Sequence, residues 1–268
     1  MKTLAVIPAR YASTRLPGKP LVVVGGIPLV VRVFRGLASC RRVDRVVVAV
    51  DDDRVAKVVR DAGGEAVFTP PDLPSGGDRV AYVAEREPSF DLVVNVQVDD
   101  PLVGPDMVDP LVDILSEDPS CDVALLVRAI EDRKEVNDPG VVKVVLDLQG
   151  RPLYFSRSPI PYPRNEGGRW FKHIGPYAYR RDFLLAFAGW EPTPLERTES
   201  LEMLRMLERG HKIRAVAAPR DTVEIDTPED VAACETWFDR FGDVPWETPW
   251  NKGKSDGSSG YACGGCSN

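Results

Sequence analysis

The chain has 268 residues, a formal net charge of −7 and 43% hydrophobic residues. This apolar content is typical of globular proteins and excludes wholesale disorder, so we expect one large domain or two small ones. The acidic balance argues against a general nucleic-acid-binding protein, which needs surplus cations to neutralise phosphates. No apolar run approaches the roughly 20 residues that cross a bilayer, and the opening run is too short for a signal peptide. We therefore expect a cytoplasmic protein that binds neither nucleic acid nor membranes.

The first half of the chain alternates apolar runs with helical patterns. Residues 2–7, 46–50 and 91–98 are rich in β-branched residues and are typical of buried strands. Residues 29–37 and 53–62 have the spacing of helices between those strands. This alternation predicts an α/β fold, with a mostly parallel sheet that is flanked by helices on both faces.

The pattern changes after residue 120. Residues 122–127 and 141–147 are predicted as strands, and residues 195–209 as one amphipathic helix. Thr227 and Pro228 have the sequence of a helix start, so we expect a last helix there. From residue 245 the composition turns to Gly, Ser, Asn and Lys, which predicts a mobile tail.

Five cysteines are scattered along the chain, an odd number that does not indicate a disulfide framework. Cys263 and Cys266 in the tail have CxxC spacing. A single such pair cannot complete a structural zinc site of four ligands. We assign the tail no function.

The loop after the first strand carries the strongest chemical signal in the sequence. Residues 8–20 place Arg10, Arg15 and Lys19 among small residues with free backbone N–H groups. Such a loop can hold a polyphosphate. It is neither a Walker A loop nor a GxGxxG loop, because the glycines are absent. Ligands of open α/β sheets bind beyond the carboxyl ends of the strands, which is where this loop and several acids should lie.

The loop Pro-Ala-Arg-Tyr-Ala-Ser-Thr-Arg-Leu-Pro-Gly-Lys-Pro resembles the signature of the 3-deoxy-manno-octulosonate (Kdo) cytidylyltransferases. The resemblance covers about residues 2–240. It implies a Rossmann-like nucleotidyltransferase fold with a smaller part for sugar binding and dimerisation. The similar segments follow the family's order without a large gap: residues 75–79, 95–101, 142–147, 153–157, 173–175, 201–205 and 226–230.

The family's activity is the transfer of CMP from CTP to the anomeric hydroxyl of Kdo, with Mg²⁺ and release of pyrophosphate. The resemblance implies a homodimer that acts in the cytoplasm for lipopolysaccharide biosynthesis. It implies a cytidylyltransferase domain at residues 1–244, divided into a nucleotide-binding part at about 1–120 and a sugar-binding and dimerisation part at about 121–225. Residues 245–268 remain as a flexible tail. Two alternatives stay open: CMP transfer to another acidic 2-keto sugar, such as amino-modified Kdo, and a nucleotide-binding regulator without turnover.

The resemblance also implies roles for individual residues. The groups expected to act in catalysis are Arg10, Lys19, Asp99 and Asp226. The two acids among them, Asp99 and Asp226, are the expected Mg²⁺ ligands, each after an apolar strand. The expected nucleotide-binding residues are Pro8, Ala9, Arg10, Ser13, Arg15, Lys19, Ser75, Gly76 and Asp78. The expected sugar-binding residues are Arg79, Gln97, Arg157, His173, Tyr177 and Glu202.

Two positions depart from the family pattern. The family usually has Gln-Gly-Asp-Glu-Pro where this chain has Gln-Val-Asp-Asp-Pro, and Val98 replaces its glycine. The common Gly-Thr after Ser75 is replaced by Gly76 and Gly77. A branched side chain resists the backbone freedom that glycine allows. Because Val98 lies between the expected sugar contact Gln97 and the expected metal ligand Asp99, it bears on the acceptor more than on the nucleotide.

Overall fold

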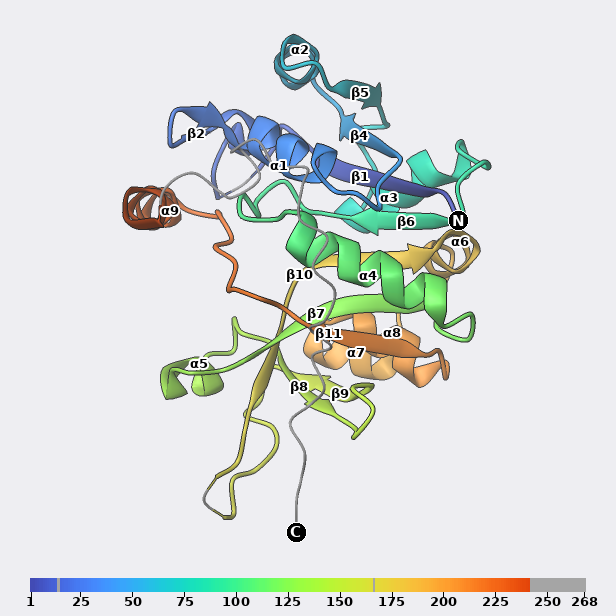
Figure 1. Ribbon diagram of the computed structural model, residues 1–268, viewed down its shortest axis with the longest axis vertical. Helices are drawn as coiled ribbons and strands as arrows, with labels where there is room; N and C mark the ends of the chain where they lie inside the picture. The colour runs from blue at the N-terminus through green and yellow to red at the C-terminus, as the bar shows by residue number, and fades with distance from the viewer. Residues whose placement is uncertain (14, 166, 242–268) are drawn as a thin grey trace, which may run out of the picture.

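The computed structural model describes residues 1–13, 15–165 and 167–241, and a nine-stranded sheet runs through them (Figure 1). The main path of the sheet has the order β11-β7-β10-β6-β1-β4-β5, and β8 and β9 branch from β10. The strands of this sheet are β1 (Thr3–Ala9), β4 (Arg45–Val50), β5 (Glu65–Phe68), β6 (Leu92–Asn95), β7 (Val123–Ala129), β8 (Lys143–Leu146), β9 (Pro152–Ser156), β10 (Phe171–Arg180) and β11 (Ile213–Ala217). A small separate pair consists of β2 (Val23–Val24) and β3 (Ile27–Pro28).

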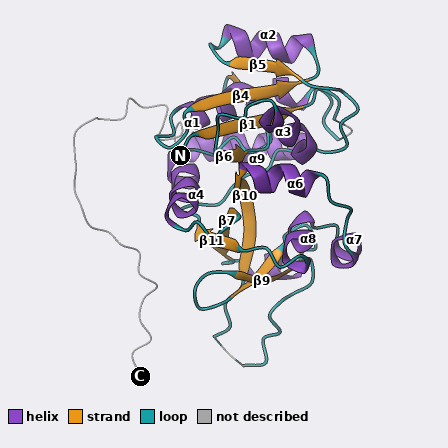
Figure 2. Cartoon of the chain, turned by 90° about the vertical axis from the view of Figure 1, so that its right-hand side faces the viewer, coloured by secondary structure: helices purple, strands orange, loops and turns teal. Residues whose placement is uncertain are grey.

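Helices cover both faces of the sheet (Figure 2). One face is covered by α1 (Leu29–Ala38), α2 (Asp53–Asp61) and α4 (Pro105–Glu117), whose apolar residues share one buried cluster. The opposite face is covered by α3 (Gly76–Glu85), α6 (Arg181–Ala188) and α8 (Glu202–Glu208). The remaining helices are η1 (Lys19–Leu21, a 3₁₀ turn), α5 (Arg133–Asn137), α7 (Pro194–Glu199) and α9 (Pro228–Phe241).

The strand prediction for the first half is confirmed. β1 pairs in parallel with β4 and β6, and all seven of its residues are buried. A strand that is covered on both faces favours continuous β-branched and aliphatic residues, which explains the apolar runs. β6 is shorter than expected, since it ends at Asn95, and residues 96–100 form a turn at the edge of the sheet.

β10 departs from the parallel pattern. It lies between β6 and β7 and runs antiparallel to both. Its pairing with β7 is interrupted between Ile174 and Tyr177, where Gly175 has φ +58°. Bulges of this kind bend a strand and redirect its side chains, often next to binding sites.

The predicted helix over residues 195–209 is wrong, because the structure contains two helices there. α7 ends at Glu199, Ser200 has the left-handed φ of +55°, and α8 begins at Glu202. Both carboxylate oxygens of Glu199 are held by β9 and the residue after it: Ser156 Oγ donates at 2.6 Å and Arg157 N at 2.8 Å. These tertiary contacts break a helix that the apolar spacing alone would continue.

The last helix returns from the second half of the chain to the first. Ile225, Cys234 and Phe238 pack with Val24 and Leu29 in a third apolar cluster. In this way α9 is anchored beside β2 and the first residue of α1, and Figure 1 shows it below β2. The segment before α9 is thereby carried back across the edge of the sheet.

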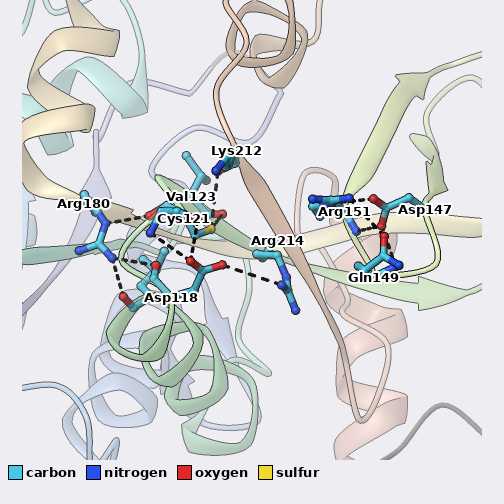
Figure 3. Close-up of polar contacts among 11 residues, drawn as sticks. Asp118, Cys121, Val123, Asp147, Gln149, Arg151, Arg180, Lys212 and Arg214 are labelled. Atoms are coloured by element: carbon cyan, nitrogen blue, oxygen red, sulfur yellow. Dashed lines mark hydrogen bonds and ion pairs between the residues drawn. The ribbon is translucent and has the colours of Figure 1, made fainter.

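Far from that edge, Arg180 fastens the end of β10 to α4 and β7 (Figure 3). Its guanidinium donates to the carbonyl oxygens of Leu115, Asp118 and Cys121 at 2.7–3.0 Å.

No helix within the described ranges is long and apolar enough to cross a membrane. The predicted tail at residues 245–268, with Cys263 and Cys266, lies outside the described residues.

Candidate active site

A pocket of about 310 Å³ opens where β1 and β6 end. Its walls come from the loop after β1, the start of α3, the turn after β6 and the segment before α9. Most of the residues predicted for nucleotide, metal and catalysis line it, together with two of those predicted for the sugar: Pro8, Arg10, Ser13, Arg15, Lys19, Ser75, Gly76, Arg79, Gln97, Asp99 and Asp226. The sequence analysis did not single out Ala12, Leu73 and Pro74, which complete the walls with Val98.

Lys19 is the centre of the charged groups in this pocket. Its Nζ lies 2.7 Å from Asp99 Oδ2 and 2.8 Å from Asp226 Oδ1, although the two acids are far apart in sequence. Burial opposes the charge of the Lys19 ammonium, but the two carboxylates outweigh it and hold the pKa of Lys19 above its ordinary value. Lys19 is therefore a permanent cation in the floor of the pocket.

The two arginines of the loop are more exposed than Lys19. Arg15 Nη1 lies 2.8 Å from the second carboxylate oxygen of Asp226, and its side chain is 68% exposed. Arg10 is exposed and donates from Nε to the carbonyl oxygen of Ala12 at 2.9 Å. Both guanidinium groups can turn toward an anion in the pocket with little desolvation cost.

Asp99 and Asp226 fit the chemistry of a Mg²⁺ site. Each gives one carboxylate oxygen to the Lys19 ammonium, so the two carboxylates lie close together. Mg²⁺ prefers hard oxygen ligands and is usually held by one or two carboxylates plus substrate phosphates. Within the described residues no set of three or more His, Cys, Asp or Glu side chains gathers as a metal cluster. The protein would thus supply two ligands, and the phosphates would supply others.

Asp226 reaches this position by a route that the sequence analysis did not foresee. It follows no strand: β11 ends at Ala217, and residues 218–226 are irregular. The segment is fixed because Ile225 N donates to the carbonyl oxygen of Asp99 at 2.9 Å. That bond places Asp226 beside Asp99.

The start of α3 forms another wall. Ser75 caps the helix by accepting from the backbone N–H of Asp78 at 3.1 Å, and its hydroxyl donates to the Asp78 carboxylate at 2.7 Å. A Cβ on Gly76 would stand only 2.9 Å from Gln97 Oε1, so glycine permits this close approach. Asp78 and Ala9 do not line the pocket. The Asp78 side chain is engaged by the cap, and Ala9 is fully buried in β1.

Arg79, predicted as a sugar contact, lies in the wall of the larger pocket, as Gln97 does. Its guanidinium is buried, bonds the hydroxyl of Thr69 and lies 3.6 Å from Asp51. Burial lowers the pKa of Arg79 below its ordinary value. Asp51 was not singled out, although it follows β4 at the same edge; its Oδ1 also accepts from Tyr11 N at 2.9 Å.

Three predicted sugar contacts lie on the face of the sheet that α3 and α8 cover, and none of them lines either cavity. His173 and Tyr177 project from β10 with ring centroids 4.9 Å apart. Glu202 begins α8, and its Oε2 would be 3.7 Å from a Cβ on Gly77. We call His173, Tyr177 and Glu202 the acceptor end of the site.

Burial favours the neutral form of each group at the acceptor end. It lowers the pKa of His173 to about 4, and Nε2 of that ring is buried without a hydrogen-bond partner among the described residues. It raises the pKa of Tyr177, an effect to which Glu202 and Glu224 add. Burial likewise raises the pKa of Glu202.

Arg157 does not join this group. Its guanidinium is occupied elsewhere, because it donates to the carbonyl oxygens of Pro139, Glu199 and Ser200 at 2.8–3.4 Å. In the structure Arg157 therefore holds the turn between α7 and α8, from which Glu202 follows.

A second cavity of about 120 Å³ adjoins the first and shares Gln97 and Asp99 with it. Its other walls are Asp100, Gly175 and Glu224, none of which the sequence analysis assigned a role. Burial raises the pKa of Asp100 well above its ordinary value, and burial also raises that of Glu224. The signal available in the sequence was proximity to Asp99 and Asp226.

Val98 has two surroundings. It is 7% exposed and belongs to the main apolar cluster, yet it also lines the nucleotide pocket between Gln97 and Asp99. Among the described residues other than glycine, only Ser200 has a positive φ, so the φ of Val98 is negative. The backbone at this position therefore accepts a branched side chain without strain.

Comparison with known proteins identifies the family. The cytidylyltransferase family profile matches residues 4–213. A 3-deoxy-manno-octulosonate cytidylyltransferase of Syntrophotalea carbinolica is 47% identical over 88% of this chain and 98% of its own length. The enzyme of that name from Myxococcus xanthus is 47% identical over 87% and 95% of the two chains.

Solved structures agree with this match. A CMP:2-keto-3-deoxy-manno-octonic acid synthetase complexed with CTP has a TM-score of 0.85 and 40% identity, over 90% of this chain and 99% of the other. A cytidylyltransferase of Leptospira borgpetersenii, 18% identical with a TM-score of 0.62 over 90% of this chain and 88% of its own, shares the fold. The chain belongs to the cytidylyltransferase family, as a member of its 3-deoxy-manno-octulosonate cytidylyltransferase group.

Proposed function

We propose that this protein transfers CMP from CTP to the anomeric hydroxyl of Kdo and releases pyrophosphate. The observation that carries the proposal is the convergence of Arg15, Lys19, Asp99 and Asp226 in one pocket. Relatives that are named for this reaction share more than 40% of their residues with the chain, and one solved relative holds CTP. These names favour Kdo over another acidic sugar and an enzyme over a regulator.

The reaction requires the acceptor hydroxyl and the α-phosphorus of CTP to be held in line. No covalent intermediate is needed, so catalysis rests on positioning and on neutralising the triphosphate charge. Lys19, fixed by two carboxylates, supplies a buried cation, and Arg10 and Arg15 supply mobile ones at the rim. Backbone groups of the two loops that line the pocket, near Pro8 and Arg10 and near Ser75 and Gly76, would read the cytosine.

Asp99 and Asp226 would hold Mg²⁺ against the CTP phosphates, where the ion would supply further charge neutralisation. Lys19 lies between these carboxylates, and the remaining N–H group of its ammonium can donate to a phosphate oxygen. Removing either acid would also leave Lys19 with one anionic partner. The metal proposal and the role of Lys19 are therefore tested by the same variants.

The acceptor would lie beside Gln97. Neutral His173 can donate to or accept from a hydroxyl, and its unpartnered Nε2 offers one such contact. Tyr177 and Glu202 flank the same space. The positive groups available to the sugar carboxylate are Arg79 and the side chains of Arg10, Arg15 and Lys19 in the loop after β1.

Pyrophosphate release with a panel of nucleotides and acceptors tests this proposal. We expect turnover with CTP and Kdo, weaker turnover with UTP, and background rates with ATP and GTP. A matched set of acidic 2-keto sugars that includes amino-modified Kdo ranks the acceptors. Efficient turnover with ATP, or none with Kdo, would contradict the proposal.

We also propose that the protein is a cytoplasmic homodimer which serves lipopolysaccharide biosynthesis. Large apolar side chains are exposed on the second part of the chain: Leu148 is 98% and Leu153 61% exposed on the β8–β9 hairpin, and Tyr162 is 85% exposed. Exposed apolar groups gathered on one part often mark an interface. Light scattering should give a dimer mass, which a Leu148→Asp, Leu153→Asp variant should halve. Phe68→Asp, at the opposite end of the sheet, is the control.

A further inference from the structure

The second cavity has the size and the lining of a subsite. It adjoins the nucleotide pocket, shares Gln97 and Asp99 with it, and measures about 120 Å³. In this measure about 10–15 Å³ is enough to hold one water molecule, so the cavity has room for several groups of that size. Every side chain in its walls carries a carboxyl or carboxamide group.

Asp100 presents an unused polar atom to this cavity. The residue is 3% exposed, and its Oδ2 has no hydrogen-bond partner among the residues that the structure describes. Its Oδ1 accepts only a long contact of 3.4 Å from Leu102 N. A buried oxygen without a partner is unfavourable, so a ligand that donates a hydrogen bond there gains affinity.

The backbone keeps the cavity open. A Cβ on Gly175 would stand 3.1 Å from Asp100 Oδ2, and the φ of +58° also favours glycine. On the opposite side, the bond from Ile225 N to the carbonyl oxygen of Asp99 fixes the segment that carries Glu224. Three separate segments are thus held around one space.

The cavity is next to the acceptor end of the site. Gln97 belongs to its wall and follows β6, whose Asn95 is paired with Tyr177 in β10. Glu202 and Glu224 both act electrostatically on Tyr177. An acceptor lying along Gln97 therefore has the cavity within reach of one of its ends.

We infer that this cavity receives the exocyclic polyol arm of the acceptor sugar acid, with Asp100 and Glu224 accepting hydrogen bonds from its hydroxyls. The inference rests on the proposed function. When an octulosonate closes a six-membered ring, three carbons remain outside the ring: the carboxylate carbon on one side, and on the other an arm of two carbons that each carry a hydroxyl. The four heavy atoms of this arm fit within the cavity. Because three acids, Asp99, Asp100 and Glu224, line the cavity, a divalent cation is the competing occupant that the test has to distinguish.

The test compares Kdo with its 8-deoxy analogue at saturating CTP, by pyrophosphate release. In the unaltered protein we expect kcat/KM to fall about tenfold to a hundredfold when the terminal hydroxyl is missing, because a site built for a hydroxyl rejects an acceptor that lacks it. In Glu224→Gln and Asp100→Asn this ratio should shrink to less than about threefold. Glu224 is more exposed than Asp100. In Glu224→Gln, the KM for CTP should therefore stay unchanged.

Glu229→Gln is the control, since Glu229 is exposed on α9 and lines neither cavity. A ratio that stays the same in both cavity variants would overturn the inference, as would equal losses with both acceptors. Binding of Mn²⁺ by the nucleotide-free protein that is lost in Glu224→Gln would overturn it in favour of a cation site. Absence of turnover with Kdo in the unaltered protein would instead contradict the proposed function.

Discussion

At the donor end of the site, made of the loop cations with Asp99 and Asp226, each carboxylate faces a cation within 3 Å. At the acceptor end, burial instead shifts the pKa of His173, Tyr177 and Glu202 toward the neutral form. The donor end is organised for an ionic ligand such as a triphosphate. The acceptor end is organised for hydroxyl groups, which need partners that can both donate and accept.

The difference also predicts how each end responds to change. Removing one charge at the donor end leaves another charge uncompensated in a partly buried place, which is costly. Removing a group at the acceptor end changes the shape of the site and its hydrogen bonds, but it leaves no charge without a partner. Four measurements test this contrast.

The largest effect is expected at the donor end. Asp99→Asn and Asp226→Asn should each lower kcat about a hundredfold to a thousandfold, because an electrostatic contact to the developing charge is worth that much in a closed site. The fold should persist, as circular dichroism can check. Asp221→Asn, which removes a partner of Lys172 outside the pocket, is the control. Full activity of both variants at limiting Mg²⁺ would remove the metal assignment.

The acceptor end should show a pH effect on stability through His173. The folded chain binds this proton near pH 4 and the unfolded chain near pH 6.5, so unfolding takes up a proton between these values. The free energy of unfolding should therefore decrease by about 3 kcal/mol as the pH falls through this window.

His173→Gln should remove most of that decrease in urea unfolding at pH 7 and pH 4.5. The chain has two histidines, and His211→Gln supplies the matched control. An identical pH dependence in all three proteins would show that His173 is not held neutral by burial.

Val98 lies at the boundary between the two ends. Val98→Gly should lower the free energy of unfolding by about 1–3 kcal/mol, since it deletes a buried side chain and frees the backbone. We also expect it to change the preference among acidic sugars more than the KM for CTP. Thermal unfolding and acceptor profiles on one preparation separate the two effects. An unchanged acceptor profile would make Val98 a core residue only.

The smallest effect concerns the turn that presents Glu202. Glu199→Gln loses one of the two carboxylate oxygens that accept from Ser156 and Arg157. We expect the KM for the acceptor to rise about tenfold, which matches one hydrogen bond to a charged group, and the KM for CTP to stay constant. Glu191→Gln, exposed before α7, is the control. Equal changes in both KM values would contradict a role confined to the acceptor end.

The sequence predicts the donor end better than the acceptor end, for a physical reason. Arg10, Arg15 and Lys19 lie in one short loop after a buried strand, so chain order alone places them at the edge of a parallel sheet. Glu202 depends on the break at Ser200, which tertiary contacts of Glu199 create and which no local pattern indicates. Arg157 is a second example. The sequence indicates an arginine at this position, but it does not indicate the backbone carbonyl groups to which the guanidinium donates.

The domain boundaries remain a prediction, and so does the separation into a nucleotide part and a sugar part. The family profile ends at residue 213. Asp226 lies beyond it, on an irregular segment that is held by the backbone bond from Ile225 to Asp99, by the contacts of Arg220 with Leu102 and Asp106, and by the packing of α9. Long-range packing of this kind is invisible to hydrophobic periodicity.

Lys19 and Asp226 are 207 residues apart in the chain. During translation, the loop that carries Lys19 is therefore synthesised long before Asp226, whose carboxylate completes the surroundings of Lys19. During synthesis, Lys19 and Asp99 can meet first, and Asp226 joins only after β11 has been added to the sheet and α9 can dock beside β2. A nascent chain thus has no finished nucleotide pocket while its second half is still being made, which couples the onset of activity to the last steps of folding.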